Sequence, residues 1–243
     1  IKPDFLDAYF DLGQVCITVG KFEDAIENFQ KVIKLKPDFS LAYNNIFFTL
    51  MYMKKNNHDL FLSLTKKFRN SFKKVDQNLL TKYQFEYKPK KLRIGFVSGD
   101  LWEHPVGYVL LGVLENLKNK DLELIAYSNF SKKDNLNIKL KSCFDIWHEI
   151  GNQKDVEVIN LIRKDKINIL FDLSGHTEKN RLSVFVSKPA PVQISWGGYP
   201  GSIGIPEIDY IIGDPYVTPQ KENKYFTEKV ITLPNIWICF TPP

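Results

Sequence analysis

Short apolar runs alternate with longer amphipathic segments over most of the chain after residue 91. Runs of this kind predict strands that are buried on both faces, as in a parallel sheet. The segments between them, such as 109–117 and 156–164, place apolar residues on one side of a helix. The pattern therefore predicts an α/β fold with a doubly wound lobe. Its expected strands are 92–98, 122–127, 144–150, 167–173, 192–196 and 208–212.

The first part of the chain has a helical period and an internal repeat. The tetrapeptide Lys-Pro-Asp-Phe at 2–5 recurs at 36–39, an offset of 34 residues. Between the copies, small residues at Gly13 and Ala25 let two antiparallel helices approach closely, and aromatic residues fill the space beside them. This spacing resembles the tetratricopeptide repeat (TPR), whose period is about 34 residues. A second unit begins near Leu41 and then decays, as terminal repeats often do.

A connecting segment is expected between these two parts. Residues 54–90 are rich in lysine, and an aromatic and leucine stripe within them has helical spacing (Phe61, Leu64, Phe68 and Phe72). This pattern is typical of an amphipathic helix. We therefore expect TPR repeats over 1–53, a helical linker over 54–90 and an α/β lobe over 91–243.

Three of the expected strands end in loops of unusual composition, at 98–105, 172–177 and 196–201. The carboxyl ends of parallel strands lie at the same edge of a sheet, and ligands bind beyond that edge. The sequence therefore predicts that the three loops converge on one site.

Asp100 and His104 are the candidate catalytic residues in the first loop. An imidazole there can relay a proton or donate to a phosphate or a sugar hydroxyl, and a carboxylate can fix its tautomer. The simpler interpretation is that Asp100 caps the next helix and His104 is a polar loop residue. Pro105 and Gly107 are expected to shape the turn into that helix, whose N-terminus favours an anionic group.

The other two loops supply candidate substrate-binding residues. His176 and Thr177 lie in a hydroxyl-rich loop that suits a sugar or a phosphate, although an ordinary turn explains them as well. Gly197 and Gly198 allow a close backbone approach to a ligand, and Tyr199 can stack on a sugar or a base; a tight turn and core packing are the alternatives.

Four other polar residues carry weaker signals. Asp209 and Asp214 bracket a strand and could pair as acid and base, but Asp214 precedes Pro215 and is expected to form a turn. His58 and His148 are expected to be structural.

Composition and charge exclude several classes of protein. The net charge of +5 comes from scattered lysines, so nucleic-acid binding is not indicated. No apolar run approaches the roughly 20 residues of a membrane helix. The three cysteines, far apart, have no metal-site spacing and favour free thiols in a reducing compartment. The sequence predicts a cytoplasmic protein that is not bound to a membrane and has no metal site.

Several motifs in order resemble one known family. They are 92–100 followed by 104–107, then 172–177, then 188–201, and a tail from 208–210 through 233–234 to 240–243. With the TPR helices in front, they resemble the O-GlcNAc transferase and SPINDLY family, glycosyltransferase family 41. The resemblance covers nearly the whole chain.

The resemblance implies the N-terminal, Rossmann-like lobe of an inverting GT-B glycosyltransferase. The family moves a sugar, usually N-acetylglucosamine (GlcNAc) from UDP-GlcNAc, to serine and threonine hydroxyls of intracellular proteins, without a cofactor or a metal. In the family pattern, His104 corresponds to a histidine at the donor sugar and the acceptor, Asp100 to a candidate for proton handling, and Gly198 to a glycine near the sugar. TPR helices choose the protein substrates.

Two departures limit the expected activity. The chain has Met51-Tyr52-Met53 where family members often carry Asn-Tyr-His, and it stops where the second lobe of the fold is expected to begin. That lobe supplies most nucleotide contacts, so the isolated chain is expected to be inactive. Two alternatives stay open: a TPR-based binding module with an inactive lobe, and a protein O-fucosyltransferase that uses GDP-fucose.

Overall fold

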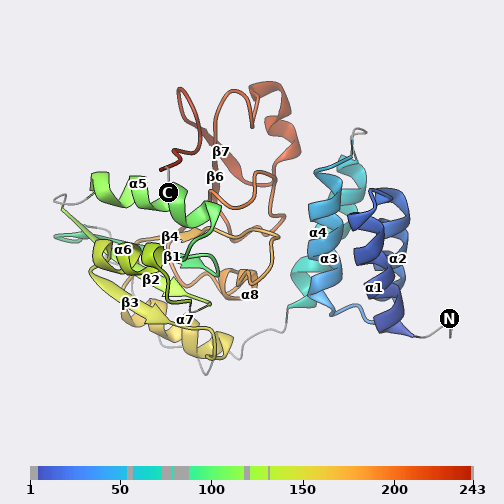
Figure 1. The fold of residues 1–243 in the computed structure, drawn as a ribbon, viewed down its shortest axis with the longest axis horizontal. Helices are drawn as coiled ribbons and strands as arrows, with labels where there is room; N and C mark the ends of the chain where they lie inside the picture. The colour runs from blue at the N-terminus through green and yellow to red at the C-terminus, as the bar shows by residue number, and fades with distance from the viewer. Residues whose placement is uncertain are drawn as a thin grey trace. The chain divides into compact units, whose positions relative to one another are not determined.

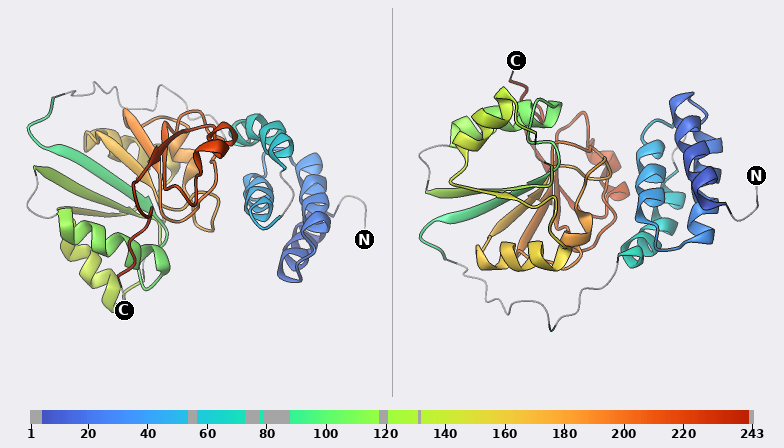
Figure 2. Two further views of the ribbon diagram at one scale, coloured as in Figure 1. Left: turned by 90° about the horizontal axis from the view of Figure 1, so that it is seen from above. Right: turned by 60° about the horizontal axis from the view of Figure 1, so that its bottom comes forward.

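The computed structural model describes residues 5–53, 57–72, 78, 88–117, 121–130 and 132–241. The chain divides into two compact units, 1–73 and 74–243 (Figure 1). The first consists of helices, and the second contains a sheet with helices on both of its faces (Figure 2).

The helical unit begins with the antiparallel pair that the repeat predicts. Helices α1 (Leu6–Thr18) and α2 (Phe22–Leu35) pack along their length. A Cβ atom at Gly13 would lie 2.6 Å from the Phe29 ring, so only glycine allows this approach of the two helices. Ala25 is fully buried. The antiparallel helix pair that the repeat predicts is thus present.

Helix α3 (Ser40–Leu50) pairs with α4 (His58–Ser71), which the sequence pattern assigns to a connector. Phe47 lies between two rings of α4, with centroids 5.0 Å from Phe61 and 5.3 Å from Phe68. Its bulk, unexpected for a TPR position, fills the space between the helices. The predicted amphipathic helix exists, but it belongs to the helical unit. Most of the remaining connector, 73–77 and 79–87, lies outside the described residues.

The lobe contains one parallel sheet of seven strands in the order β3-β2-β1-β4-β5-β6-β7. All neighbouring strands run parallel, which confirms the predicted doubly wound fold. The strands are β1 (Leu92–Ser98), β2 (Leu122–Ser128), β3 (Ile146–Glu149), β4 (Ile169–Asp172), β5 (Val192–Ser195), β6 (Tyr210–Gly213) and β7 (Lys229–Thr232).

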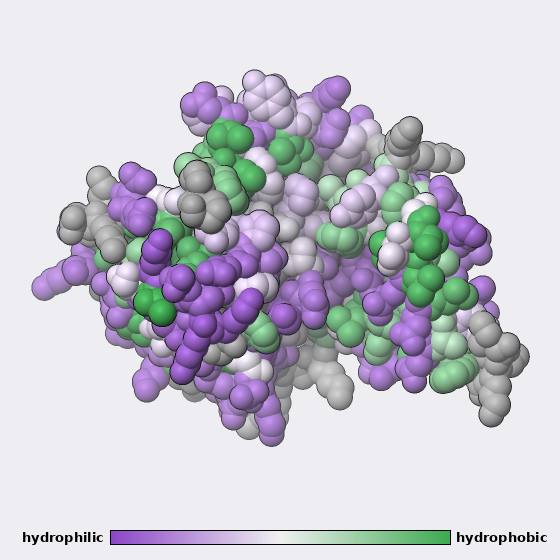
Figure 3. All heavy atoms as spheres, viewed as in Figure 1, coloured by the Kyte–Doolittle hydropathy of each residue, from purple (hydrophilic) through white to green (hydrophobic). Residues whose placement is uncertain are grey.

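Helices cover the two faces of the sheet (Figure 2). Helices α5 (Pro105–Leu117) and α6 (Asn135–Cys143) lie on one face, and α7 (Asp155–Lys164) and the short α8 (Leu182–Phe185) lie on the other. Under α5 and α6, a core of aliphatic side chains packs around Phe96 and Ala126. The outer surface around α6 is mainly hydrophilic (Figure 3).

Several elements of the lobe escape the sequence pattern, among them the short helix α8, strand β7 and helix α6. Strand β7 is an edge strand with three of its four residues exposed, so its sequence has no buried apolar run. Helix α6 buries only Leu136, Asn137, Leu140 and Cys143 among polar neighbours.

Helix α5 begins at Pro105, so Pro105 and Gly107 lie inside the helix and not in a turn before it. Pro105 takes the first helical position, where its missing N–H costs nothing.

The chain after β7 returns to α5. The Trp196 indole donates to the Trp237 carbonyl at 2.7 Å, and Tyr108 contacts the Phe240 ring, with centroids 5.7 Å apart.

None of the helices that the structure describes has both the length and the apolar character to cross a bilayer.

Candidate functional site

The three loops singled out in the sequence meet at one edge of the sheet. Strands β1, β4 and β5 are neighbours, and their register aligns Val97 with Asp172 and Asp172 with Ser195. All three strands run in the same direction, so the loops that follow them leave from the same edge. The chain moves outward in opposite directions from β1 and from β4, so this point is the topological switch where parallel sheets bind ligands.

His104 and Asp100 face each other in the first loop. The Nε2 atom of His104 lies 4.0 Å from Oδ1 of Asp100, which is too far for a hydrogen bond. The Asp100 N–H donates to the Ser98 hydroxyl at 2.9 Å, and the Trp102 indole donates to the Gly99 carbonyl at 3.0 Å. These bonds fix the turn that brings the two side chains together.

His104, and not Asp100, caps helix α5. The Val106 N–H donates to Nδ1 of His104 at 3.3 Å. In a neutral imidazole this leaves the proton on Nε2, the nitrogen that faces Asp100. The cap therefore selects a tautomer that can donate from Nε2 to a carboxylate, a phosphate or a sugar oxygen. One third of the His104 side chain, 34%, is exposed, so a ligand can reach it.

The charge of Asp100 is set by opposing effects. The side chain is nearly buried, with 11% of it exposed. Burial raises the pKa of the Asp100 carboxyl, and Glu178 adds to the rise, while His104, Lys179 and the Trp102 indole oppose it. A carboxylate with a raised pKa is a better proton acceptor than a free one.

The second and third loops interlock through glycines. A Cβ atom on Gly198 would lie 2.1 Å from the Leu173 carbonyl oxygen, and one on Gly175 would lie 2.4 Å from Cβ of Tyr199. Real Cβ atoms do not come this close, so both positions need glycine. Gly197 differs, since its Cβ would meet open space but its φ is 91°. A side chain at position 197 would therefore meet open space, and only the backbone angle favours glycine there.

Asp172 ties these two loops to their strands. Its carboxylate accepts from the N–H groups of Ser174 at 3.2 Å and Gly175 at 2.9 Å, and from the Ser195 hydroxyl at 3.3 Å. The residue is 1% exposed. Burial raises the pKa of Asp172 to about 6, and the three donors only partly offset that rise.

Replacing Asp172 is expected to make stability depend less on pH. Because its pKa is higher in the folded chain than the usual 3.8, the folded state holds the proton more tightly, and stability falls as pH rises from about 4 to about 6. The loss amounts to about 3 kcal/mol, at roughly 1.4 kcal/mol per pH unit. Asp172→Asn cannot ionise and does not lose this stability. Between pH 4 and pH 7, the difference in free energy of unfolding between the variant and the original chain should therefore shift in favour of the variant by up to about 3 kcal/mol.

Urea unfolding followed by tryptophan fluorescence measures this difference, because all four tryptophans lie in the lobe. Burial lowers the pKa of His176 to about 3, which makes the folded state less stable in acid. This contribution is common to both variants and cancels in the comparison. If the difference in free energy of unfolding between the two proteins is the same at pH 4 and at pH 7, Asp172 does not titrate in this range.

The structure buries two residues that the sequence pattern assigns to substrate binding. His176 is 3% exposed, its Nε2 lies 3.1 Å from the Ile203 carbonyl, and its ring packs edge-on against Tyr199 with centroids 5.0 Å apart. Tyr199 is 3% exposed, and burial raises its pKa. Both side chains support the loops from behind, so direct contact with a ligand is not supported for either. The sequence reveals an aromatic or polar loop residue but not which way it faces.

Thr177 forms hydrogen bonds within its own loop. Its hydroxyl donates to the Ser174 carbonyl at 2.7 Å, and its carbonyl accepts from Asn180 at 2.8 Å. Pro105 is exposed beside His104 at the start of α5. Among the predicted site residues, Asp100, His176 and Tyr199 are buried, and the others are half-buried or exposed.

The aspartates around β6 do not pair as acid and base. Asp209 binds the Lys188 ammonium group and accepts from the Gln193 N–H at 2.8 Å. Asp214 accepts from the N–H groups of Tyr216, Val217 and Trp237. Burial alone would raise the pKa of Asp214, but these three donors bring it below its usual range. The turn-forming interpretation of Asp214 agrees with the structure.

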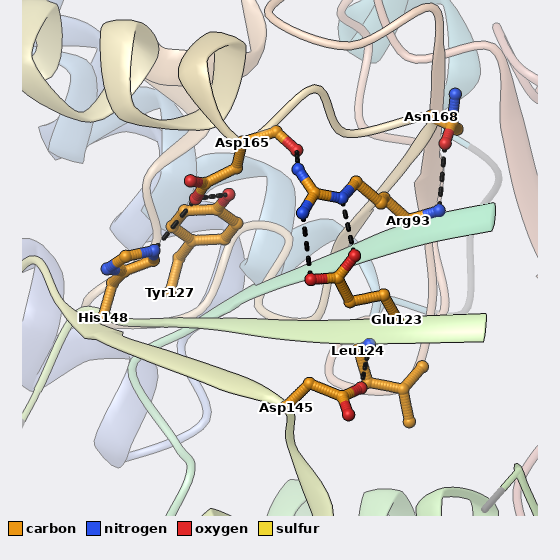
Figure 4. A network of polar contacts seen from close by, with 8 residues as sticks. All are labelled: Arg93, Glu123, Leu124, Tyr127, Asp145, His148, Asp165 and Asn168. Carbon is orange, nitrogen blue, oxygen red and sulfur yellow. Dashed lines mark hydrogen bonds and ion pairs between the residues drawn. The ribbon is translucent and has the colours of Figure 1, made fainter. Parts of the chain in front are cut away.

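The expected structural histidines have partners away from the site. His148 lies 2.9 Å from Asp165, which also accepts from the Tyr127 hydroxyl at 2.7 Å (Figure 4). In the same network, Arg93 forms a two-point ion pair with Glu123 near the amino ends of β1 and β2. His58 begins α4 and stacks on Phe61.

Sequence analysis missed three residues behind the site. Arg181 is a half-buried hub that donates to Asp155, Asn129 and the Ile150 carbonyl. Asn129, fixed in this way, donates to the Lys179 carbonyl at 2.8 Å. Only an alignment of relatives could single out such residues, since each stands alone in the sequence.

Side chains with metal-binding chemistry do not gather within the described parts of the chain: no group of three or more His, Cys, Asp or Glu residues there could hold an ion. Cys16 and Cys143 are buried free thiols, and Cys239 is exposed.

The fold and the site together define a class of protein: a Rossmann-like lobe with a polar site at its switch point, preceded in the chain by TPR helices. The model of glycosyl transferase family 41 matches residues 54–240, and the tetratricopeptide repeat model matches 6–39. The chain therefore belongs to glycosyl transferase family 41.

Individual relatives agree with this membership. The chain is 28% identical over 221 residues to "Probable UDP-N-acetylglucosamine--peptide N-acetylglucosaminyltransferase SPINDLY" of Oryza sativa subsp. japonica, across 89% of this chain and 24% of that protein. It is 31% identical over 150 residues to the protein of similar name, SEC, of Arabidopsis thaliana, across 61% of this chain and 15% of that one.

A solved structure is similar over the whole chain. A mutant O-GlcNAc transferase of Thermobaculum terrenum superposes with a TM-score of 0.87 at 30% identity, which covers 100% of this chain and 46% of that one. The chain thus spans about a quarter of the length of the curated SPINDLY relatives and just under half of the solved chain.

Proposed function

We propose that this chain is the acceptor-side part of a protein O-glycosyltransferase that moves GlcNAc from UDP-GlcNAc to serine or threonine hydroxyls. The observation that carries the proposal is the pair of partly exposed His104 and buried Asp100 at the switch point of the family 41 lobe. Names of relatives support the donor and the reaction, since they are UDP-N-acetylglucosamine–peptide N-acetylglucosaminyltransferases.

The reaction asks for groups that the site can supply. The acceptor oxygen attacks the anomeric carbon, the bond from that carbon to the UDP oxygen breaks, and the hydroxyl proton goes to a base. His104 would donate from Nε2 to the sugar or the phosphate, and Asp100, with its raised pKa, would take up the proton directly or through a water. The dipole at the N-terminus of α5 would favour negative charge on the departing diphosphate.

The other roles in the proposal belong to the rest of the site and the chain. Pro105, Thr177, Gly197 and Gly198 would shape the binding surface, with His176 and Tyr199 as its buried supports. The TPR helices would hold protein acceptors. Reaction without a metal fits the site, and the free thiols favour action in the cytoplasm.

A transfer assay with two donors tests the proposal. A complete protein that contains this chain should incorporate radiolabelled GlcNAc from UDP-GlcNAc into protein serine or threonine, and residues 1–243 alone should incorporate none, because relatives are two to four times longer. Transfer of fucose from GDP-fucose instead would show that the donor is GDP-fucose and not UDP-GlcNAc. Loss of both transfers in the complete protein would favour a binding module.

A further inference from the structure

Lys179 has a conformation that a lysine rarely adopts. Its φ is 58°, in the left-handed region that mainly glycine and asparagine occupy. Non-glycine residues with this geometry cost about 1 kcal/mol or more and persist where the surroundings hold them in place. The residue lies in the loop after β4, three residues before α8 and three after the buried His176.

A hydrogen bond from the loop after β2 holds this conformation, and further hydrogen bonds fix its donor. Asn129, after β2, donates to the Lys179 carbonyl at 2.8 Å, and its own N–H donates to the Ser98 carbonyl at 2.7 Å. Arg181 donates to Asn129 at 2.6 Å and to Asp155 at 2.8 Å, at the start of α7. The chain of contacts therefore links the loops after β1, β2 and β4 through one lysine backbone.

The side chain of Lys179 begins directly against the catalytic loop. A Cβ atom on Gly99 would lie 2.6 Å from Cβ of Lys179, so the two residues pack backbone against backbone, next to Asp100. The ammonium group lies 3.8 Å from the centroid of the Phe130 ring. A cation over an aromatic face is held in position without losing its charge.

The charges around Asp100 come from few groups. His104 faces it from its own loop, and Lys179 and Glu178, in the loop after β4, act on it electrostatically. On the adjoining segments, Lys132 lies over the Trp102 ring at 4.1 Å and Asp134 accepts from the Glu103 N–H. Lys179 favours the carboxylate, and Glu178 opposes it.

We propose that Lys179 is a positioning residue for sugar transfer, which acts through Asp100. Its left-handed backbone seats the turn at Gly99, directly before Asp100, and the Phe130 ring holds its ammonium group in position. The inference rests on the proposed function, because it assigns Lys179 to the reaction that Asp100 would serve.

Three variants separate charge from backbone. Lys179→Asn tolerates the left-handed conformation but removes the charge, and Lys179→Arg keeps the charge. Lys166→Asn is the matched control, because Lys166 also has a positive φ, 52°, but lies between α7 and β4, at the opposite edge of the sheet.

The first measurement needs no activity. Carboxyl ¹³C resonances of the chain are titrated by NMR, with Asp100 assigned through Asp100→Asn. The midpoint of Asp100 should rise by about half a pH unit or more in Lys179→Asn and stay unchanged in Lys179→Arg and Lys166→Asn. An Asp100 midpoint that is the same in Lys179→Asn and in the original chain would overturn the inference.

The second measurement uses the complete enzyme. Lys179→Asn should lower kcat several-fold near neutral pH, move the acid limb of the rate profile upward, and leave KM for UDP-GlcNAc within about twofold. If the unmodified enzyme transfers sugar and Lys179→Asn matches it at every pH, the inference fails while the proposed function stands. If the unmodified enzyme transfers no sugar, the proposed function fails and the inference fails with it.

Discussion

Replacement of His104 by alanine is expected to reduce sugar transfer by a complete family 41 enzyme that carries this chain about 100-fold or more, mainly through kcat. A positioned acid or base typically contributes about 100- to 10,000-fold. KM for UDP-GlcNAc should change little, because the loss falls on the reacting groups. Steady-state kinetics with the radiolabelled donor measures both constants.

Two further histidine variants distinguish chemistry from structure. His104→Asn keeps a side chain that can cap α5, as the Nδ1 atom of His104 does, but it cannot carry a proton near neutral pH. It should unfold at the same urea concentration as the original protein and remain about 100-fold slower. His148→Gln alters a histidine away from the site and should keep most of the activity. More than a tenth of the original activity in His104→Asn would contradict a chemical role.

Gly198→Ala is expected to have the largest effect on stability. The added methyl group would lie 2.1 Å from the Leu173 carbonyl, where the two loops interlock and no flexible side chain can yield. Forced overpacking of this kind costs about 1–3 kcal/mol or more, and it separates the loops that form the site. Urea unfolding by tryptophan fluorescence, together with the transfer assay, should show a less stable lobe and a strong loss of activity.

The neighbouring Gly197→Ala provides a matched control. Its methyl group would meet open space, so only the positive φ of 91° opposes it, at a cost of about 1–2 kcal/mol. The lobe should therefore be less affected by this change than by Gly198→Ala. Equal losses of stability in the two variants would show that backbone conformation, and not the contact with Leu173, makes Gly198 necessary.

The pattern of apolar residues was sufficient to predict the parallel sheet. Strands such as 92–98 are buried on both faces, and burial on both faces leaves a continuous apolar run. Elements with little burial leave no such run, and for this reason the exposed edge strand β7 was missed. Helix α4 was predicted but misplaced, because its apolar stripe does not reveal that Phe47 of α3 is what it packs against.

The candidate site could be located from the sequence but not resolved in detail. The predicted strand ends placed Asp100, His104 and Gly198 at one edge, because parallel strands share the edge at which their carboxyl ends lie. The direction of each side chain did not follow: His176 and Tyr199 turn into the protein, where loop packing against Ile203 and Gly175 decides their place. Lys179 carries no sequence signal, because its role depends on a backbone angle and on contacts with the loops after β1 and β2.

The central claim is that the edge formed by the loops after β1, β4 and β5 holds the acceptor at the reacting sugar. Photo-crosslinking in the complete enzyme tests it: an acceptor peptide with a benzophenone side chain beside its target serine is irradiated with UDP present, and the adducts are mapped by mass spectrometry. Adducts within 99–107, 174–177 or 197–199 are the predicted result. Adducts confined to the opposite edge of the lobe, such as 163–168, would contradict the account.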